Sequence, residues 1–218
     1  MNFLKNLKIG LRLALAFGTV LVLMLVVAAV GLMGIGKVST SLKSVYEDRT
    51  VPLAQLSEIQ YNFVRNRVLV MDMLGRPEPA NIERRSTELE ANLARSSEIL
   101  KAYLATEMTT EEQRLIDEYQ KLRSDFNQRG LLALAAAVSA GKVDEAQKIY
   151  LEVISPNSPA VEKTLRGLVD VQINQGKVEY DNANATSESV RLTTIVASII
   201  ALAIGAALAW AIAASITR

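Results

Sequence analysis

Two long stretches without a charged residue constrain this chain more than any other feature. The first runs from Leu13 to Ile35 and the second from Leu192 to Ile216. Each exceeds the roughly 20 apolar residues with which a helix crosses about 30 Å of hydrocarbon. We therefore predict transmembrane helices at 13–35 and 192–216, with one water-exposed segment, 36–191, between them. Both termini then lie on the same side of the membrane.

The distribution of charge predicts the orientation. Lys5, Lys8 and Arg12 precede the first stretch without any acidic residue, whereas all 23 Asp and Glu residues lie in segment 36–191. Short basic tails usually stay in the cytoplasm. We therefore predict a bacterial inner-membrane protein with a cytoplasmic tail, 1–12, and a periplasmic domain. A cleaved signal peptide is the alternative, but its apolar core is usually only about 7 to 15 residues long, which favours an uncleaved anchor.

The absence of two residue types narrows the possible functions. The chain has no histidine and no cysteine, which are the usual ligands of zinc and haem and the usual acid–base and nucleophilic groups of enzymes. We expect no cofactor, no metal and no enzymatic activity. Segment 36–191 carries a net negative charge, which argues against binding nucleic acid, because that requires a basic surface.

Apolar residues in steps of three and four predict an all-α fold for the middle segment. The first helix is expected to continue out of the membrane and to end at Gly75. Pro52 should kink it or start a new helix with Thr50 as cap. Its expected seam consists of Leu42, Tyr46, Arg49, Leu53, Leu56, Gln60, Phe63, Arg67, Val70 and Leu74.

Three further long helices and one short helix complete the prediction. The second begins at Pro79, and the third begins at Thr109, which has capping-box spacing to Glu112, and stops near Gly141. A short helix over 143–153 follows. We expect Ser155–Pro159 to break the chain, and a last helix, capped by Ser158, to run into the second span. Because the helices have similar lengths, we predict an antiparallel up-down four-helix bundle between two transmembrane helices. The third seam is expected to contain Leu115, Tyr119, Leu122, Phe126, Arg129, Ala133 and Ala136.

Arginines in the predicted seams are candidate binding residues. Arg67 and Arg129 fall in these seams, and Arg65 and Arg123 lie beside them. A buried guanidinium needs a partner, because an unpaired buried charge destabilises the fold by roughly several kcal/mol. Each arginine must therefore meet a ligand, a carbonyl or an acid of the bundle. The candidate acids are Asp72, Asp125, Glu162 and Asp170.

The first helix is also apolar on nearly all sides between Phe63 and Leu74. A helix of this kind is buried on nearly all sides, which predicts a homodimer. Arginines with Tyr61 and Asn66 at the dimer interface are suited to binding a small carboxylate by bidentate pairing.

Several blocks resemble one family over essentially the whole chain. The start, LKNLKIGLRLALAFG, precedes the blocks YEDRTVPLAQL and YNFVRNRVL, and AAAVSAGKVDEAQKIYLEVISPNSP precedes a second span that ends in SITR. These blocks are similar to the N-terminal half of bacterial methyl-accepting chemotaxis proteins with a four-helix-bundle ligand-binding domain. In that family SITR begins the HAMP linker, here residues 217–218.

The resemblance implies a homodimeric receptor that binds small attractants, such as amino acids or organic acids. Its last helix would pass the signal to a HAMP domain and a kinase-control module, which this chain is expected to lack. Arginines of the first helix commonly hold the ligand in relatives, and Arg65 and Arg67 match them by position. Arg123 and Phe126 on the third helix are weaker candidates for ligand contact. The complete expected ligand-binding set is Tyr61, Arg65, Asn66, Arg67, Arg123 and Phe126.

The last helix turns polar over 172–189 and carries Gln172, Gln175 and Glu179 where a seam favours leucine. We interpret this as weak packing that permits a small sliding motion. Three alternatives to a chemoreceptor remain: the same sensor module on a histidine kinase, the same module on a cyclic-dinucleotide enzyme, and a structural membrane bundle without a ligand.

Overall fold

The computed structural model describes residues 8–216, and within this range the chain is helical and contains no strand. The predicted all-α class is confirmed. The chain divides into two compact units, one formed by Ser44–Val178 and the other by Met1–Lys43 together with Glu179–Arg218. Residues 1–7 of the predicted tail and the predicted HAMP start at 217–218 lie outside the described residues.

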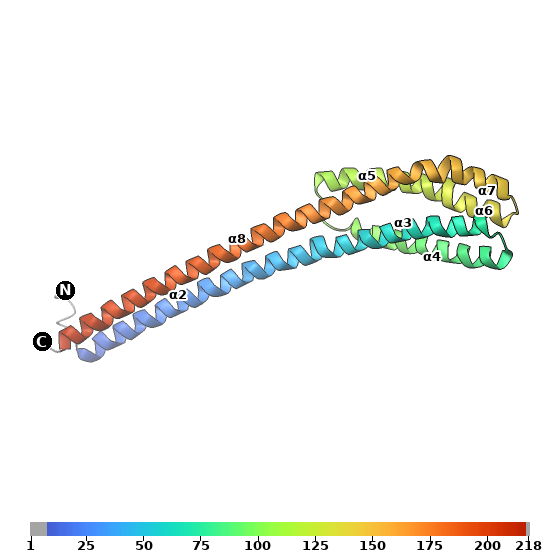
Figure 1. Cartoon of the computed structure of the whole chain (residues 1–218). Helices are drawn as coiled ribbons and strands as arrows, with labels where there is room; N and C mark the ends of the chain where they lie inside the picture. The colour runs from blue at the N-terminus through green and yellow to red at the C-terminus, as the bar shows by residue number, and fades with distance from the viewer. Residues whose placement is uncertain (1–7, 217–218) are drawn as a thin grey trace. The chain divides into compact units, whose positions relative to one another are not determined.

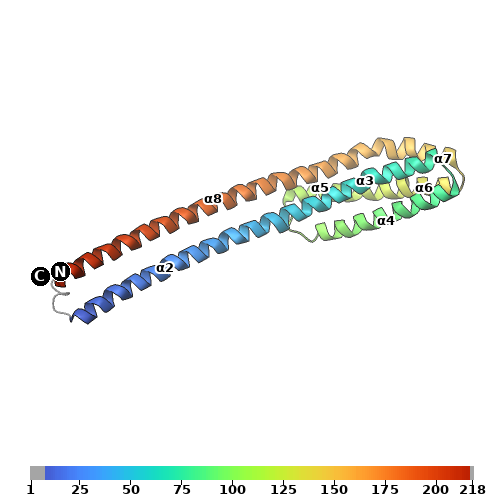
Figure 2. The same cartoon turned by 60° about the horizontal axis from the view of Figure 1, so that its bottom comes forward.

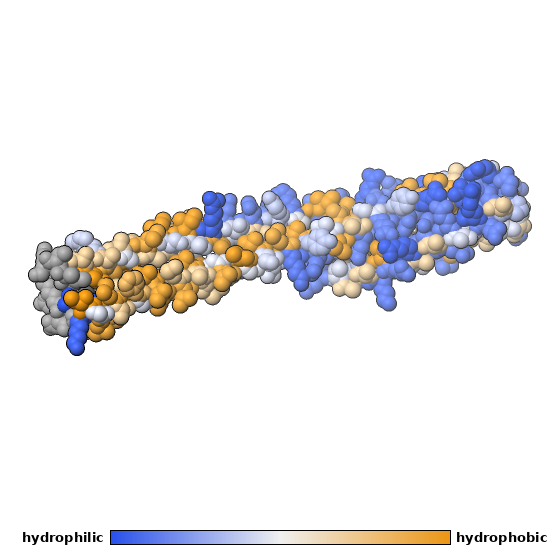
Figure 3. All heavy atoms as spheres, turned by 90° about the horizontal axis from the view of Figure 1, so that it is seen from below, coloured by the Kyte–Doolittle hydropathy of each residue, from blue (hydrophilic) through white to orange (hydrophobic). Residues whose placement is uncertain are grey.

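The unit that contains both chain ends consists of two apolar helical segments. Helix α2 (Ile9–Ser44) runs beside the C-terminal part of α8 (Ser155–Ile216), as Figures 1 and 2 show. Hydrophobic side chains cover this part of the surface in Figure 3. Both helices are long and apolar enough to cross a membrane. Gly34 is buried against Val190, which leaves no space there for a Cβ atom.

The unit Ser44–Val178 is an antiparallel bundle of four helices, which we number in chain order. Bundle helix 1 consists of the π-turn η1 (Val45–Thr50) and α3 (Val51–Gly75), and bundle helix 2 is α4 (Pro79–Tyr103). Bundle helix 3 comprises α5 (Thr110–Asp125), η2 (Phe126–Leu132) and α6 (Ala133–Ser139). Bundle helix 4 comprises α7 (Val143–Ile149), η3 (Tyr150–Ile154) and α8 up to Val178. The α3–α4 loop and the α6–α7 turn lie at the same end (Figures 1 and 2).

Local signals place the helix ends where the sequence predicts them. Helix α3 ends at Gly75, and α4 begins at Pro79, whose missing N–H costs nothing at a first helical position. The Thr109 side chain accepts a hydrogen bond from the Glu112 N–H, and the Glu112 carboxylate accepts one from the Thr109 N–H, which completes the capping box. Gly141 has a φ of 73°, a left-handed conformation that glycine adopts without strain, and it ends α6.

The predicted break at Ser155–Pro159 is wrong, and so are the caps predicted at Thr50 and Ser158. Helix α8 starts directly after η3, Pro159 lies inside it, and Ser158 is buried with its hydroxyl donating to the Ile154 carbonyl at 2.6 Å. Thr50 likewise makes no side-chain cap. Proline lacks the N–H that the hydrogen bonds of an α-helix require. Here the π-turn η3 lies directly before the prolines of α8.

A π-turn precedes both Pro52 and Pro156. The N–H of Val51 bonds to the Tyr46 carbonyl, five residues back, immediately before Pro52. The N–H of Ser155 bonds to the Tyr150 carbonyl immediately before Pro156. In each case the i→i+5 bond shifts the ladder by one residue at the position where the proline has no N–H to give.

The core contacts are rotated relative to the predicted seams. On α3 the buried side chains include Ile59, Phe63, Asn66, Val70 and Met73, again in steps of four and three. Asn66 thus occupies the interior position that we predicted for Arg67. Leu42 and Tyr46, both expected in the seam, are exposed.

On bundle helix 3 the π-turn η2 explains the deviation. A π-turn holds one residue more than an α-helical turn, so the buried position after Phe126 is Gly130 and not Arg129. The added residue turns Arg129 outward, where its side chain is 71% exposed. Gly130 permits close packing, because a Cβ atom there would lie 3.1 Å from Ile154 Cγ1.

Candidate functional site

An aromatic pair lies at the centre of the candidate site. Phe63 of α3 and Phe126 of η2 are buried, and their ring centroids are 5.3 Å apart at 46°, a tilted geometry favoured by aromatic quadrupoles. The Arg67 guanidinium lies over the Phe63 ring, 5.7 Å from its centroid. This distance is within the range of a cation–π interaction, which holds the charge beside the core.

A mostly apolar cavity of about 20 Å³, with a few polar groups in its wall, lies beside this pair. Asn66, Ser96 and Arg123 contribute polar atoms to its wall, and Phe63 and Phe126 contribute apolar surface. A volume of this size holds about one water molecule. An amino acid or organic acid therefore needs side-chain movement to enter, or binds at the outer rim near the arginines.

Hydrogen bonds between α3 and α4 fix the cavity wall. The Asn66 side-chain carbonyl accepts a bond from Asn92 Nδ2 at 2.9 Å, and Asn62 Nδ2 donates to the Ser96 hydroxyl at 3.2 Å. The Asn62 and Asn66 amides are almost fully buried, and each bond avoids the cost of an unsatisfied buried group. Asn66 has a structural partner already.

Arg67 differs from the other candidate arginines. Its side chain is partly buried, and its Nε atom is buried without a hydrogen-bond partner. It forms no ion pair with any acidic residue in the described part of the chain. A guanidinium without an internal acidic partner can pair with an added carboxylate.

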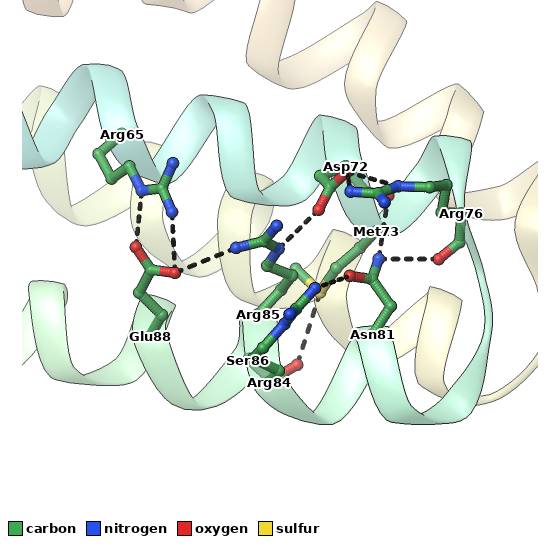
Figure 4. Close-up of polar contacts among 9 residues, drawn as sticks. All are labelled: Arg65, Asp72, Met73, Arg76, Asn81, Arg84, Arg85, Ser86 and Glu88. Carbon is green, nitrogen blue, oxygen red and sulfur yellow. Dashed lines mark hydrogen bonds and ion pairs between the residues drawn. The ribbon is translucent and has the colours of Figure 1, made fainter.

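Arg65, two residues away, has an internal partner. Its Nε and Nη2 donate to the Glu88 carboxylate at 2.6 and 3.0 Å (Figure 4). This bond lowers the pKa of Glu88 below its ordinary value. Asp72, proposed above as a possible acid for the arginines, instead accepts bonds from Arg76 and Arg85 (Figure 4), and its pKa is lowered by Arg76 first.

Arg65–Glu88 belongs to a ladder of ion pairs between α3 and α4. Its other members are Glu58–Arg95 at 2.7 Å and Asp72–Arg85 at 2.6 Å. The α3 members Glu58, Arg65 and Asp72 are seven residues apart and therefore lie on one face of the helix. Sequence reasoning missed this ladder, although the seven-residue spacing with alternating charge is its signal.

The two remaining candidate arginines, Arg129 and Arg123, differ in their contacts. Arg129 pairs with Asp125, one turn earlier in its own helix, at 3.1 Å, as the alternative reading of the sequence allowed. Arg123 donates to the Ser97 hydroxyl at 2.6 Å and lines the cavity. Arg123 therefore keeps a position beside Phe126 without an acidic partner in the described part of the chain.

Tyr61 faces away from the cavity. It is 67% exposed and belongs to a row on α3 with Val64, Val68 and Met71, all exposed. We call these four residues the α3 stripe. The structure thus brings Asn66, Arg123 and Phe126 together around the cavity, with Arg67 over Phe63, and places Tyr61 and Arg65 on other faces of α3.

A second polar cluster was missed by sequence reasoning. Glu112 is fully buried, and its Oε1 accepts bonds from the Tyr103 hydroxyl at 3.2 Å and from Gln172 Nε2 at 2.5 Å. Gln172 Nε2 also donates to the Tyr103 hydroxyl at 3.1 Å, and Arg49 Nη1 lies 3.7 Å from Glu112 Oε2. Burial raises the pKa of Tyr103 to about 12. We call Arg49, Tyr103, Glu112 and Gln172 the Glu112 network.

The network corrects the interpretation of Gln172 as a weak seam position. Its side chain is 2% exposed and bonds to two other bundle helices. The sequence signal was partial: the spacing of Thr109 and Glu112 predicts the capping box, but nothing local identifies the distant partners.

Comparison with known proteins gives one family. A family model described as a four helix bundle sensory module for signal transduction matches residues 6–187. Searches among curated proteins and among solved structures gave no significant match. The matched range includes the first apolar stretch and the whole unit Ser44–Val178.

Proposed function

Because this chain belongs to the four-helix-bundle sensory family of methyl-accepting chemotaxis proteins, we propose that it is the input module of a chemoreceptor. It binds a small organic acid or amino acid in the periplasm and transmits the signal through its last helix. The observation that carries the proposal is that one sensory-module family spans both the first apolar helix and the bundle. The module has no catalytic role of its own.

Charge distribution supports the proposed topology. The basic residues Lys8 and Arg12 flank the first span, whereas the acidic residues all lie between the two spans. Basic flanks favour the cytoplasm, so the bundle faces the periplasm and both ends of the chain face the cytoplasm. A periplasmic ligand then acts on α8, which continues into the second span.

Arg67 is the proposed centre of ligand recognition. Its guanidinium has no acidic partner in the described chain and lies over Phe63, and Arg123 lines the adjacent cavity. A carboxylate is the complement of such a pair of guanidinium groups. Phe63 and Phe126 would contact the apolar part of the ligand. Arg65, already paired with Glu88, has a structural role in this proposal.

Thermal unfolding of the full chain in nanodiscs, with a panel of organic acids and amino acids, tests ligand binding. A ligand that binds only the folded state raises the unfolding midpoint. For any acid that does so, we expect Arg67→Ala to weaken binding by roughly 10- to 100-fold, since a charge-assisted hydrogen bond contributes about 1.5–3 kcal/mol.

Arg129→Ala is the matched control, because Arg129 is exposed and pairs within its own helix. It should bind as the wild type does. Equal affinity of the Arg67→Ala and wild-type chains would refute the proposed site. A midpoint unchanged by every compound would favour the structural bundle, which the internal pairing of Arg65 and Arg129 also favours.

The α3 stripe supports a homodimer. It exposes the side chains of Tyr61, Val64, Val68 and Met71 in steps of three and four along one face, the pattern of a helix that packs against another helix. Because the chain lacks cysteine, a single Val68→Cys substitution can report the contact. We expect it to form a disulfide-linked dimer in membranes, whereas Glu118→Cys, on exposed α5 surface, should remain monomeric. Equal cross-linking of both variants would count against the stripe as the interface.

A further inference from the structure

The Glu112 network joins all four bundle helices in one buried layer. Arg49 comes from bundle helix 1, Tyr103 from helix 2, Glu112 from helix 3 and Gln172 from helix 4. The carboxylate is fully buried, and the other three side chains surround it within 2.5 to 3.7 Å. A buried polar network of this kind fixes the positions of its members, because leaving any of them unpaired is costly.

The bundle helices are otherwise held in different ways. Three ion pairs cross between α3 and α4, at Glu58–Arg95, Arg65–Glu88 and Asp72–Arg85. Between Ser155 and Gly176, by contrast, the side-chain hydrogen bonds from α8 to other bundle helices all come from Gln172. The rest of this stretch meets the bundle through apolar residues such as Val161, Leu165 and Leu168.

Apolar contacts and hydrogen bonds respond differently to sliding. Apolar packing is not directional, whereas a hydrogen bond weakens steeply outside about 2.7–3.2 Å. Gln172 donates to both Glu112 and Tyr103, and its Oε1 is buried without a hydrogen-bond partner. An axial shift of α8 by one residue, about 1.5 Å, would therefore move Gln172 Nε2 away from its present position against both acceptors, and a shift by one turn, about 5.4 Å, would break both bonds.

We propose that the Glu112 network is a register lock for α8, which holds this helix at one axial position and must open before the helix can move. The idea rests on the proposed function, in which movement of α8 carries the signal. Gln172 is thus a positioning residue, and the ion-pair ladder holds bundle helices 1 and 2 together as a fixed reference.

Spin-label distances test the lock in the full chain in nanodiscs. The absence of cysteine allows one label at Lys121→Cys on α5 and one at Asn174→Cys on α8, both exposed positions offset along the bundle. In the wild-type background we expect one narrow distance distribution. In Gln172→Met, which keeps the side-chain length but removes the amide, we expect a second or broader distribution, displaced by about 1.5 Å or more.

Gln175→Met is the matched control, because Gln175 lies one turn further along α8 and makes no side-chain hydrogen bond to another helix in the described structure. It should leave the distribution unchanged. Tyr103→Phe removes one of the two Gln172 acceptors and should give a smaller broadening. Superimposable distributions for wild type and Gln172→Met, or equal broadening in Gln175→Met, would overturn the lock.

A second variant, Glu112→Gln, covers the case in which Gln172→Met fails to fold. If circular dichroism shows that Gln172→Met does not fold, Glu112→Gln, which preserves shape but removes the charge, takes its place, and an unchanged distribution then overturns the proposal. The measurement needs no ligand. A lock that is present in chains that respond to no compound would therefore contradict the receptor proposal while leaving the lock itself supported.

Discussion

Arg65 and Arg67 show how two residues of the same type acquire different roles within one helical turn. Residues two positions apart point about 200° away from each other around an α-helix. Arg65 reaches α4 and pairs with Glu88, whereas Arg67 lies over Phe63 and forms no ion pair with a described acid. The YNFVRNRVL block thus supplies one structural and one available guanidinium.

Because Glu58 and Glu88 of the ladder are paired with arginine, we expect the free energy of unfolding to decrease at acidic pH. Hydrogen bonds from arginine lower the pKa values of Glu88 and Glu58 below the ordinary 4.5. A carboxylate with a lowered folded-state pKa stabilises the fold fully above its unfolded pKa, and this contribution disappears as the pH falls through the folded value. We expect the unfolding midpoint of the full chain in detergent to stay constant from pH 7 to about pH 5. At pH values below the ordinary glutamate pKa of 4.5 the midpoint should decrease.

Glu88→Gln provides the control for this pH dependence. The variant should be less stable at pH 7 by less than about 1 kcal/mol, because the pair is partly exposed and screened by solvent. The two stability curves should converge in acid, where the wild-type carboxylate is protonated as well. Parallel curves over the whole range would show that other groups cause the acid loss.

The ends of the helices can be predicted from the sequence, whereas the π-turns within them cannot, and the reason is physical. Helix ends at Gly75, Pro79 and Gly141 depend on the chemistry of a few adjacent residues, and the sequence predicts them. The π-turns before Pro52 and Pro156 depend on whether tertiary packing retains the helix through a proline. Propensity alone predicts a break there.

The candidate site follows the same division. Sequence reasoning identified Asn66, Arg67, Arg123 and Phe126, which the structure brings to one region. It misplaced Arg129, because η2 adds a residue and rotates everything after Phe126. A helical count cannot detect such an insertion, since the apolar residues around it fit two phases equally well.

At the scale of paired helices, the ion-pair ladder predicts a measurable coupling. Exchanging the charges of one pair, in Arg65→Glu with Glu88→Arg, should restore most of the stability that either single substitution removes. A double-mutant cycle by chemical unfolding should give a coupling of about 0.2–1 kcal/mol, typical of partly exposed pairs. A coupling of zero would mean that the Arg65–Glu88 pair does not stabilise the packing of α3 against α4.

For the whole molecule, the proposed topology predicts which residues meet the periplasm. Glu107, an exposed residue of the α4–α5 loop, should react with a membrane-impermeant maleimide after substitution by cysteine, once the outer membrane is permeabilised. Lys8→Cys, at the start of the chain, should react only after the inner membrane is disrupted. Reversed labelling would place the bundle in the cytoplasm and end the receptor proposal.

The π-turns also bear on how this protein can tolerate changes in length. Removing one residue from an ordinary helix turns all later side chains by about 100°, which scrambles their neighbours. Removing one residue from η2 can instead be absorbed by tightening the wide turn into a regular one. Bundle helix 3 therefore holds one residue that can be deleted without rotating the side chains that follow, whereas bundle helix 2, which is a regular α-helix throughout, does not.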